Sequence, residues 1–315
     1  MNNLNTEQKT ILVAGANGNL GLEIINRLEN DVNNRIIAVS REVTPVIRQH
    51  SSVTYYTYQE LFSEQELKID IIINCAYPLK INANEDNLNK TRRLALSLMD
   101  LGIKRWNSRL YINMSCHCVY GEHRETPVRE DVNIDGRRNL DQYAEHRFTT
   151  ERLLERATNN HIVLINLRLA DMVGQMYSQQ IIDDLIREAL SSNSVTPINV
   201  RNRYSFIDID DVTNTVNRII NTDLFMFGST VYNLGTISNF MTPNFGPITT
   251  QNIVEIIGNS IPNTMVNDAI NDEHNGEISY LMDSTALFEI LHWKPEISIV
   301  NSIIRRIEEI RLEFI

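Results

Sequence analysis

The feature that most constrains this chain is a glycine-rich turn near its start. An apolar run over residues 11–14 leads directly into Gly15, Gly18 and Gly21, and an amphipathic run over residues 22–28 follows. A strand that turns through closely spaced glycines into a helix brings the backbone close to a diphosphate, whose charge the N–H groups at the helix N-terminus stabilise. The pattern therefore predicts a dinucleotide-binding turn. A strand–turn–helix unit that only packs is the alternative, because the first gap is one residue longer than in the usual fingerprint.

Composition narrows the classes of protein further. The chain has 315 residues, enough for one large domain or two modest ones with a buried core. With 29 basic and 40 acidic residues its net charge is −11, which argues against non-specific binding of nucleic acid or of an anionic membrane. The first ten residues are polar, no run reaches membrane-spanning length, and three cysteines are too few for a disulfide framework. We therefore expect a cytoplasmic protein without a nucleic-acid or membrane partner.

One short segment, Cys116-His117-Cys118, places metal-ligating residue types together. Alternation along a strand would put the two thiols on one face and the imidazole on the other. The sequence has no second ligand pair with zinc-like spacing. We therefore expect no metal site.

Strand-like and helix-like segments alternate through the first half of the chain. The strand candidates are residues 11–14, 36–40, 53–56, 69–74, 110–114 and 162–167, and the helix candidates between them are 21–29, 87–101 and 141–157. This alternation predicts an α/β fold, a doubly wound parallel sheet of the Rossmann type with right-handed crossovers. Ligands bind such a sheet at the carboxyl ends of its strands, where the glycine turn lies.

The pattern changes after residue 168. Helices are expected at residues 180–190, 211–220, 250–258, 284–291 and 299–313, strands at 204–209 and 231–234, and a loop at 235–247. We expect residues 1–168 to form the dinucleotide-binding domain, with 204–234 returning to it. Residues 169–203 and 235–315 would form a smaller C-terminal substrate lobe.

Further short motifs follow the glycine turn in order. They are Asp70-Ile-Ile-Ile-Asn74-Cys-Ala76, Asn87-x-x-x-Thr91, Ser115-Cys-His-Cys-Val119-Tyr-Gly121, Tyr143-x-x-x-Arg147 with Glu151, Leu167-Arg168, Phe206-Ile-Asp-Ile-Asp210-Asp211-Val212, Tyr232-Asn-Leu-Gly235 and Leu291-His-Trp-Lys-Pro295. Each is weak alone, but together the chain resembles, over nearly its whole length, the extended short-chain dehydrogenases/reductases that act as nucleotide-sugar epimerases, dehydratases and reductases. The resemblance implies a pyridine dinucleotide cofactor and a nucleotide-linked sugar as substrate.

The chemistry of that family depends on a Tyr-x-x-x-Lys pair, which Tyr143 and Arg147 match here. Residues one helical turn apart share a face, so the cation lies near the phenol and favours the phenolate. The tyrosine exchanges a proton with the substrate while hydride passes to or from the nicotinamide. Arginine keeps the charge but has a bulkier, planar head, so the exchange is not conservative. Tyr143 as an ordinary packed tyrosine, and Arg147 with Glu151 as a surface ion pair, are the alternatives.

A second departure concerns the serine or threonine that contacts the substrate oxygen in the family. That position is Cys116 here, and a thiol is a weak hydrogen-bond donor. Ser115 is adjacent but would point to the opposite face of a regular strand. The catalytic residues that the resemblance implies are thus Tyr143, Arg147, Cys116 and Ser115. Because two of the three family positions differ, a member that binds cofactor without much turnover is a second hypothesis.

The resemblance also implies a set of cofactor contacts. They are Gly15, Asn17, Gly18, Leu20 and Gly21 in the turn, Ser40 and Arg41 after the second strand, Asn74 and Ala76 after the fourth, and Tyr143 and Arg147 on the helix. A carboxylate after the second strand would repel the 2′-phosphate of NADP, whereas Arg41, with Arg48 nearby, suits it. We therefore predict NADP(H), with NAD as second choice; Arg41 stacked on adenine or solvated is the alternative. Tyr58-Gln59 stands where family members commonly have Asp-Leu, which leaves the adenine contact open.

Two arginines, Arg168 and Arg203, are the candidates for contact with the substrate's diphosphate, and Arg168 is alternatively a structural ion-pair partner. The resemblance further implies a homodimer through helices near 87–101 and 141–156, where Leu94, Leu98 and Leu101 form either an interface stripe or core. The predicted function is an NADP(H)-dependent oxidoreductase, a reductase or epimerase, acting on a nucleotide-linked keto sugar. The alternatives are a catalytically degenerate subunit or regulator, and an enzyme for a non-sugar carbonyl.

Overall fold

The computed structural model describes residues 8–42, 52–121, 127–134, 140–158, 161–174, 180–238, 246–270 and 279–314. Arg48, most of the expected polar N-terminal segment and residues 239–245 of the expected loop lie outside them. The chain divides into two compact units. The first comprises residues 1–119, 140–167 and 213–231, and the second comprises 120–139, 168–212 and 232–315.

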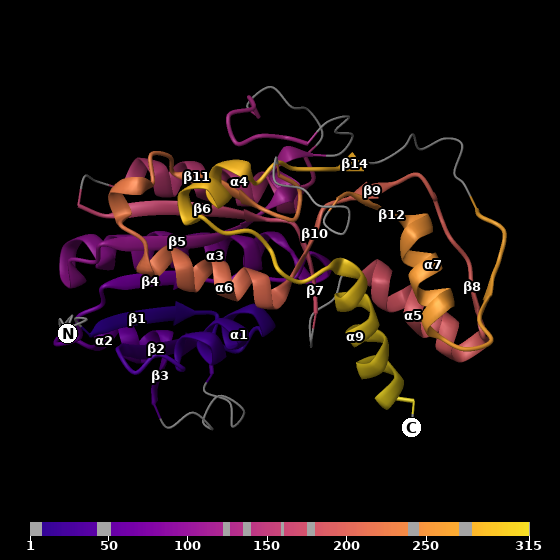
Figure 1. Ribbon diagram of the computed structural model, residues 1–315. Helices are drawn as coiled ribbons and strands as arrows, with labels where there is room; N and C mark the ends of the chain where they lie inside the picture. Colours follow the sequence, from indigo (N-terminus) through magenta and orange to yellow (C-terminus); the bar gives the residue numbers. More distant parts are fainter. Residues whose placement is uncertain are drawn as a thin grey trace, which may run out of the picture. The chain divides into compact units, whose positions relative to one another are not determined.

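A seven-stranded sheet runs in the order β11-β6-β5-β4-β1-β2-β3 (Figure 1). Its strands are β1 (Lys9–Ala14), β2 (Asn34–Ser40), β3 (Val53–Thr57), β4 (Ile71–Asn74), β5 (Leu110–Cys116), β6 (Val163–Leu169) and β11 (Val231–Leu234). The pairs β1–β2, β2–β3, β1–β4 and β4–β5 are parallel. The strand order reverses direction at β1 and β4, the point at which doubly wound sheets bind ligands. The predicted fold class is confirmed.

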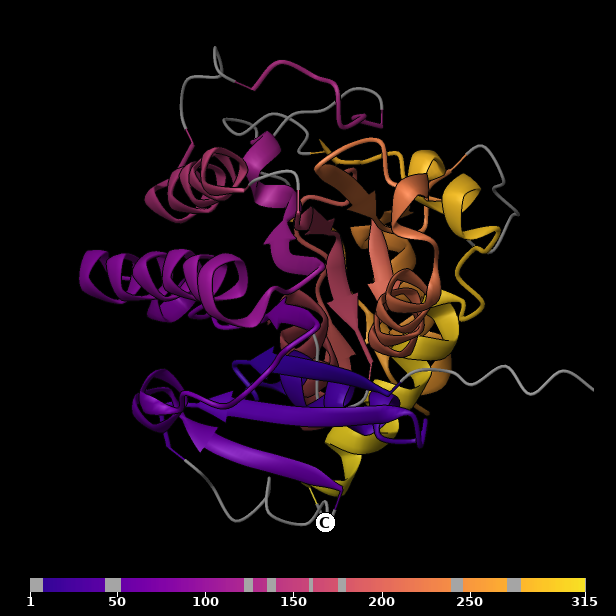
Figure 2. The ribbon, with the colours of Figure 1, turned by 90° about the vertical axis from the view of Figure 1, so that its left-hand side faces the viewer.

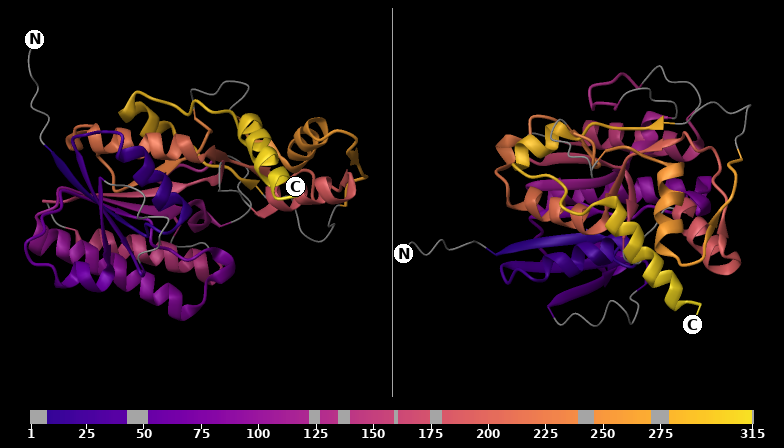
Figure 3. Two further views of the ribbon diagram at one scale, coloured as in Figure 1. Left: turned by 90° about the horizontal axis from the view of Figure 1, so that it is seen from below. Right: turned by 45° about the vertical axis from the view of Figure 1, so that its right-hand side comes forward.

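Helices cover both faces of this sheet. On one face lie α3 (Glu85–Leu101) and α4 (Gln142–Ala157), and on the other lies α1 (Asn19–Leu28) (Figures 2 and 3). The hydroxyl of Tyr111 in β5 donates to the Ala95 carbonyl of α3 at 3.0 Å. On the α1 face lies α6 (Ile209–Asn221), whose Ile220 carbonyl accepts from Lys9 Nζ at 3.2 Å.

Side-chain caps fix where α3 and α4 begin. The Asn84 side chain accepts the Asn87 N–H at 2.9 Å, and the Asp141 side chain accepts the Ala144 N–H at 2.8 Å. An oxygen-bearing side chain at this position satisfies an N–H that the helix itself leaves unpaired, which contributes about 1 kcal/mol. The cap at Asp141 fixes the register of α4 just before Tyr143.

One core cluster of the first unit lies between the sheet and the layer of α3 and α4. All four residues of β4 are buried, as expected of a strand covered on both faces. Leu98 is fully buried, and Leu94 and Leu101 pack against the same cluster. The leucine stripe is therefore part of the core, and the homodimer stays a prediction.

The second unit is built from short strands and four further helices. The strands form three small sheets, β10 (Phe206–Asp208) with β7 (Asp171–Val173), β9 (Arg203–Tyr204) between β12 (Ile248–Thr249) and β14 (Ser279–Tyr280), and β8 (Ser194–Val195) with β13 (Met265–Val266). The helices are α5 (Gln180–Ser192), α7 (Thr250–Ser260), α8 (Thr285–Leu291) and α9 (Ile299–Leu312) (Figure 3, right). Apolar residues of α5, α7 and α9 share one core, in which the Tyr204 ring stacks on Phe206 at 5.4 Å.

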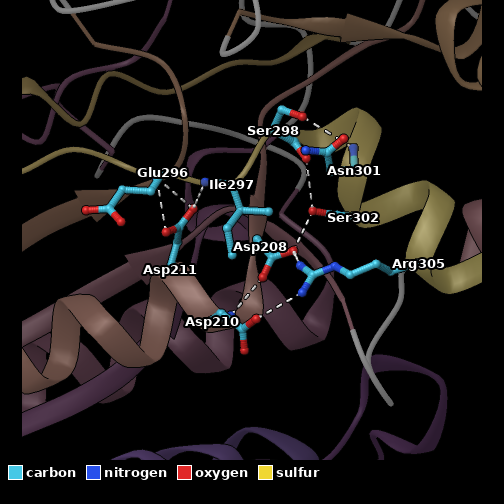
Figure 4. A network of polar contacts seen from close by, with 9 residues as sticks. All are labelled: Asp208, Asp210, Asp211, Glu296, Ile297, Ser298, Asn301, Ser302 and Arg305. Carbon is cyan, nitrogen blue, oxygen red and sulfur yellow. Dashed lines mark hydrogen bonds and ion pairs between the residues drawn. The ribbon is translucent and has the colours of Figure 1, made fainter.

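Three aspartates join the end of β10 and the start of α6 to the segment that leads into α9 (Figure 4). Asp208 is fully buried and accepts hydrogen bonds from Ser302 and Arg305. Asp210 accepts from Arg305 Nη1 at 3.1 Å. The carboxylate of Asp211 accepts the backbone N–H of Glu296 at 3.1 Å and that of Ile297 at 3.0 Å. The aspartates of the Phe206–Val212 motif therefore have structural roles.

Burial raises the pKa of Asp211 from 3.8 to about 6, and the nearby carboxylate of Asp208 adds to this increase. The folded protein therefore binds a proton near pH 5 that the unfolded chain releases. Stability from this group is fully present below the unfolded pKa and is lost as the pH rises through the folded value. Asparagine does not titrate, so the free energy of unfolding of Asp211→Asn should decrease less between about pH 4 and 7 than that of the unmodified protein. We expect the two decreases to differ by on the order of 2 kcal/mol. Chemical denaturation of both proteins across this range measures the difference, and parallel pH curves would contradict it.

Most predicted elements match the structure within a few residues, but the short strands β7, β8, β12, β13 and β14 were not predicted, and other details differ. The strand expected at 204–209 is two strands, β9 and β10, with Ser205 between them. A short helix, α2 (Tyr58–Ser63), begins at a capping box formed by Thr57 and Glu60, which the strand–helix alternation did not predict. A π-helical turn (Gly102–Trp106) extends α3.

Candidate active site

The glycine turn has the geometry that its residue types require. Gly15 has φ +81°, and a Cβ on it would lie 2.8 Å from the backbone of Cys75 and Ala76. A Cβ on Gly21 would overlap the Gly15 carbonyl oxygen. Gly18 is the N-cap of α1 and provides no side-chain cap, so the helix presents its first turn of backbone to a ligand. Asn19 and Leu20 begin that first turn.

The end of β2 lies next to this turn. Arg41 is exposed, whereas Ser40 is buried and its hydroxyl donates to the Glu42 carbonyl. The same carbonyl accepts from Asn17 Nδ2 at 2.8 Å. Two of the predicted contacts, Ser40 and Asn17, therefore donate to one backbone oxygen, and the exposed Arg41 is next to Ser40 in the chain.

A tyrosine that the sequence left open also contacts the turn. The hydroxyl of Tyr58 accepts the Gly15 N–H at 3.1 Å. Burial raises the pKa of Tyr58 to about 12, against the effect of the Arg41 charge. Tyr58 is thus a neutral phenol packed on the glycine turn. No sequence signal links residue 58 to residue 15; only the fold brings them together.

Asn74 belongs to a buried row of polar side chains across β4, β5 and β6. Its amide nitrogen donates to Asn113 Oδ1 at 3.1 Å, and Asn113 in turn donates to Asn166 Oδ1 at 2.9 Å. The Tyr77 hydroxyl donates to the same Asn113 oxygen at 2.6 Å. The Asn74 oxygen accepts the Ala76 N–H at 3.2 Å, which shapes the backbone after β4. No sequence motif marked Tyr77, Asn113 or Asn166 as residues of the site.

Helix α4 brings the predicted pair together. The Arg147 guanidinium carbon lies 5.4 Å from the centroid of the Tyr143 ring and 3.6 Å from that of Tyr77. Only 7% of Arg147 is exposed, and its Nε and Nη1 have no hydrogen-bond partner among the described residues. Burial disfavours the charge, but the neighbouring Tyr143 and Tyr77 raise the pKa of Arg147 above its ordinary value. The site therefore contains a permanent cation stacked on one phenol and close to another.

Ser115 and Cys116 point to different partners. The Ser115 hydroxyl donates to the carboxylate of Glu151, which is fully buried on α4. The alternative of a surface ion pair between Arg147 and Glu151 is therefore wrong, because both side chains are buried. Ser115 orients a buried carboxylate that belongs to α4, the helix that also carries Tyr143.

The Cys116 sulfur accepts a hydrogen bond instead of donating one. The Cys118 N–H donates to it at 3.1 Å. Contact with Cys118 and the charges of His117 and Arg147 lower the pKa of Cys116 below its ordinary value, although burial opposes this. These effects favour a sulfur that accepts hydrogen bonds and does not donate a proton to a substrate oxygen as a serine would.

The second unit contains the two arginines predicted for the substrate. Arg168 is 3% exposed and donates from Nη1 to the Tyr120 hydroxyl at 2.9 Å. That hydroxyl donates to Asn233 Oδ1 at 2.6 Å, so Arg168 belongs to a buried polar cluster. Arg203 lies partly buried in β9. Their role as substrate ligands stays a prediction.

The part of the chain that the structure describes contains no group of three or more His, Cys, Asp or Glu residues placed to bind a metal ion. No helix within it is long and apolar enough to cross a membrane.

Residues 11–235 match the model of the NAD dependent epimerase/dehydratase family, so the chain belongs to that family. A sequence search among curated proteins finds no match.

Solved structures of sugar-nucleotide enzymes share the fold. UDP-glucuronic acid 4-epimerase from Bacillus cereus, in complex with UDP-glucuronic acid and NAD, aligns with a TM-score of 0.78 and 17% identity over 96% of this chain and 99% of its own. The dTDP-glucose 4,6-dehydratase from Bacillus anthracis, with NAD, aligns at 0.74 and 15% identity over 96% and 97%. UDP-glucose 4-epimerase from Thermotoga maritima, with UDP-glucose, aligns at 0.73 and 16% identity over 97% and 100%.

Proposed function

We propose that this protein is an NADP(H)-dependent oxidoreductase that acts on a nucleotide-linked keto sugar, as a reductase or an epimerase. The observation that carries the proposal is the Arg147 guanidinium 5.4 Å from the Tyr143 ring, in the same unit as the glycine turn. Family membership and structural neighbours that were solved with sugar nucleotides and NAD support it. We place the protein in the cytoplasm and expect a homodimer.

The residues present fit a pyridine dinucleotide. The N-terminus of α1 suits its pyrophosphate, because no side chain caps that helix. The unpartnered Nε and Nη1 of Arg147 are buried donors, which is costly unless a ligand such as a ribose hydroxyl accepts from them. When bound, the cofactor supplies the atom that gives or takes hydride.

Each residue of the site then has a distinct task. Tyr143 exchanges a proton with the sugar oxygen, and Arg147 stabilises the phenolate form by its fixed charge. Tyr77 fixes Arg147 by stacking at 3.6 Å, and Asn113 fixes Tyr77 by accepting from its hydroxyl. Because Cys116 is an acceptor, Tyr143 is the proton donor to the substrate in this scheme.

Cofactor preference follows from the end of β2. We expect NADP⁺ to bind more tightly than NAD⁺, because the exposed Arg41 can form charge-assisted hydrogen bonds to the 2′-phosphate. Arg41→Ala should weaken NADP⁺ binding by about 10–100-fold and leave NAD⁺ binding unchanged. Arg27→Ala, which removes an exposed arginine from α1 of the same unit, is the control. Tighter binding of NAD⁺ than of NADP⁺ by the unmodified protein would contradict the preference.

A second function, cofactor binding without much turnover, is favoured by the same two departures. Arg147 stands at the lysine position and stacks on Tyr77, and a sulfur that accepts a hydrogen bond stands where a hydroxyl donor is needed. Under this alternative the protein would act as a subunit or regulator of a partner. An inactive parent that gains turnover as Arg147→Lys with Cys116→Ser would support it, whereas an active parent supports the oxidoreductase.

A further inference from the structure

We propose that Cys116 and Cys118 form a peroxide-sensitive thiol pair, in which Cys116 reacts with the oxidant and Cys118 closes a disulfide. The proposal does not depend on the substrate or the reaction of the enzyme. It assigns a modification site to a Cys-x-Cys segment at the end of β5.

The local backbone arranges the two sulfurs for this reaction. β5 ends at Cys116, and residues 117–120 form a single 3₁₀ turn. That turn places the Cys118 backbone nitrogen 3.1 Å from Cys116 Sγ, to which its N–H donates. Both residues are partly exposed and neither is in a disulfide. Because Cys116 and Cys118 lie two residues apart across this tight turn, their sulfurs need little movement to meet.

The groups that face the pair are on balance cationic. Arg147 of α4 and His117 of the turn both act on Cys116, and Arg147 also acts on Cys118. Lys80 lies within electrostatic reach of both thiols, and its ion pair with Asp141 at 2.6 Å places one carboxylate nearby. An electropositive, partly exposed surrounding is typical of reactive cysteines.

The two thiols differ in a way that sets their roles. The backbone N–H of Cys118 donates to Cys116 Sγ and favours its anionic form, whereas burial raises the pKa of Cys118 well above its ordinary value. Cys116 is therefore the sulfur that attacks, and Cys118 keeps its proton until the second step.

The oxidation of the two thiols takes place in two steps. The Cys116 thiolate attacks one peroxide oxygen and the O–O bond breaks, giving the sulfenic acid of Cys116 and an alkoxide or hydroxide that takes a proton from water. The Cys118 sulfur then loses its proton and attacks the Cys116 sulfur; the S–S bond forms, the S–O bond breaks, and water leaves. The peroxide is reduced by two electrons, and the two thiols are oxidised to a disulfide.

The chain contains its own control in Cys75. It is partly exposed like the other two, but in Cys75 the effect of burial outweighs that of the Arg147 charge and raises the pKa to about 12. Peptide mapping after brief iodoacetamide treatment at pH 7 should show Cys116 modified at least about tenfold faster than Cys75. The Cys116 rate should level off above neutral pH, while the Cys75 rate should continue to rise. Equal rates, or parallel pH profiles, would overturn the proposal.

Hydrogen peroxide tests the second step. The full-length protein should lose about 2 Da with a Cys116–Cys118 link, and Cys75→Ser should behave in the same way. Cys118→Ser should instead accumulate a Cys116 sulfenic acid that dimedone traps, and Cys116→Ser should form neither product. A sulfenic acid that persists on Cys116 in the unmodified protein, or no oxidation at Cys116 at stoichiometric peroxide, would overturn it.

Discussion

Replacing Tyr143 with phenylalanine is expected to lower turnover by about 10²–10⁴-fold, because the proton-transferring hydroxyl is lost while the ring remains. The ring keeps its place beside Arg147, so cofactor affinity should change little. The measurement is NADPH oxidation with a panel of nucleoside-diphosphate keto sugars, together with dinucleotide binding by each variant.

Tyr77→Phe is the matched control for this experiment. It removes the hydroxyl of the other ring that Arg147 contacts but keeps the ring itself. The centroid of that ring lies 3.6 Å from the Arg147 guanidinium carbon. It breaks the hydrogen bond to Asn113, so we expect a loss of stability of about 1 kcal/mol and less than a tenfold loss of turnover. Turnover by Tyr143→Phe at the level of Tyr77→Phe would contradict the assignment of Tyr143 as the proton carrier.

Adding one methyl group at Gly21 is expected to lower the free energy of unfolding by about 3 kcal/mol. Its Cβ would overlap the Gly15 carbonyl oxygen. The Cβ is attached directly to the backbone of residue 21 and the oxygen to that of residue 15, so the two atoms cannot separate unless the turn opens. Thermal or denaturant unfolding of Gly21→Ala measures the loss.

Gly18→Ala adds the same group three residues earlier. There the Cβ would lie 3.3 Å from the Gly15 oxygen, and its φ of −81° suits alanine, so stability should be nearly unchanged. Dinucleotide binding should still weaken by about tenfold or more, because this glycine lets the backbone approach the pyrophosphate. Equal losses of stability in both variants would contradict the steric account of the turn.

Much of the fold was predictable because its signals are local. A buried parallel strand is a continuous apolar run, as in β4, and helix starts at Asn84 and Asp141 follow from capping side chains. The helix α2 had such a signal too, in Thr57 and Glu60, but it is too short to show a helical apolar period.

The candidate site was predictable only in part. Helical spacing alone places Tyr143 and Arg147 on one face, and motif order supplies the glycines. The stacking of Arg147 on Tyr77 and the hydrogen bond from the Gly15 N–H to the Tyr58 hydroxyl join residues 70 and 43 positions apart, which no periodicity encodes. Glu151 shows the same limit, because charged residues are normally exposed and the partner that allows its burial, Ser115, is on a different element.

The proposed function requires that the glycine turn of the first unit binds a pyridine dinucleotide, and calorimetric titration tests this most directly. We predict a measurable heat of association with NADPH and weaker binding of NADH. The binding of both dinucleotides should be markedly weaker in the stably folded Gly18→Ala variant. No heat with either dinucleotide at saturating concentration would contradict it.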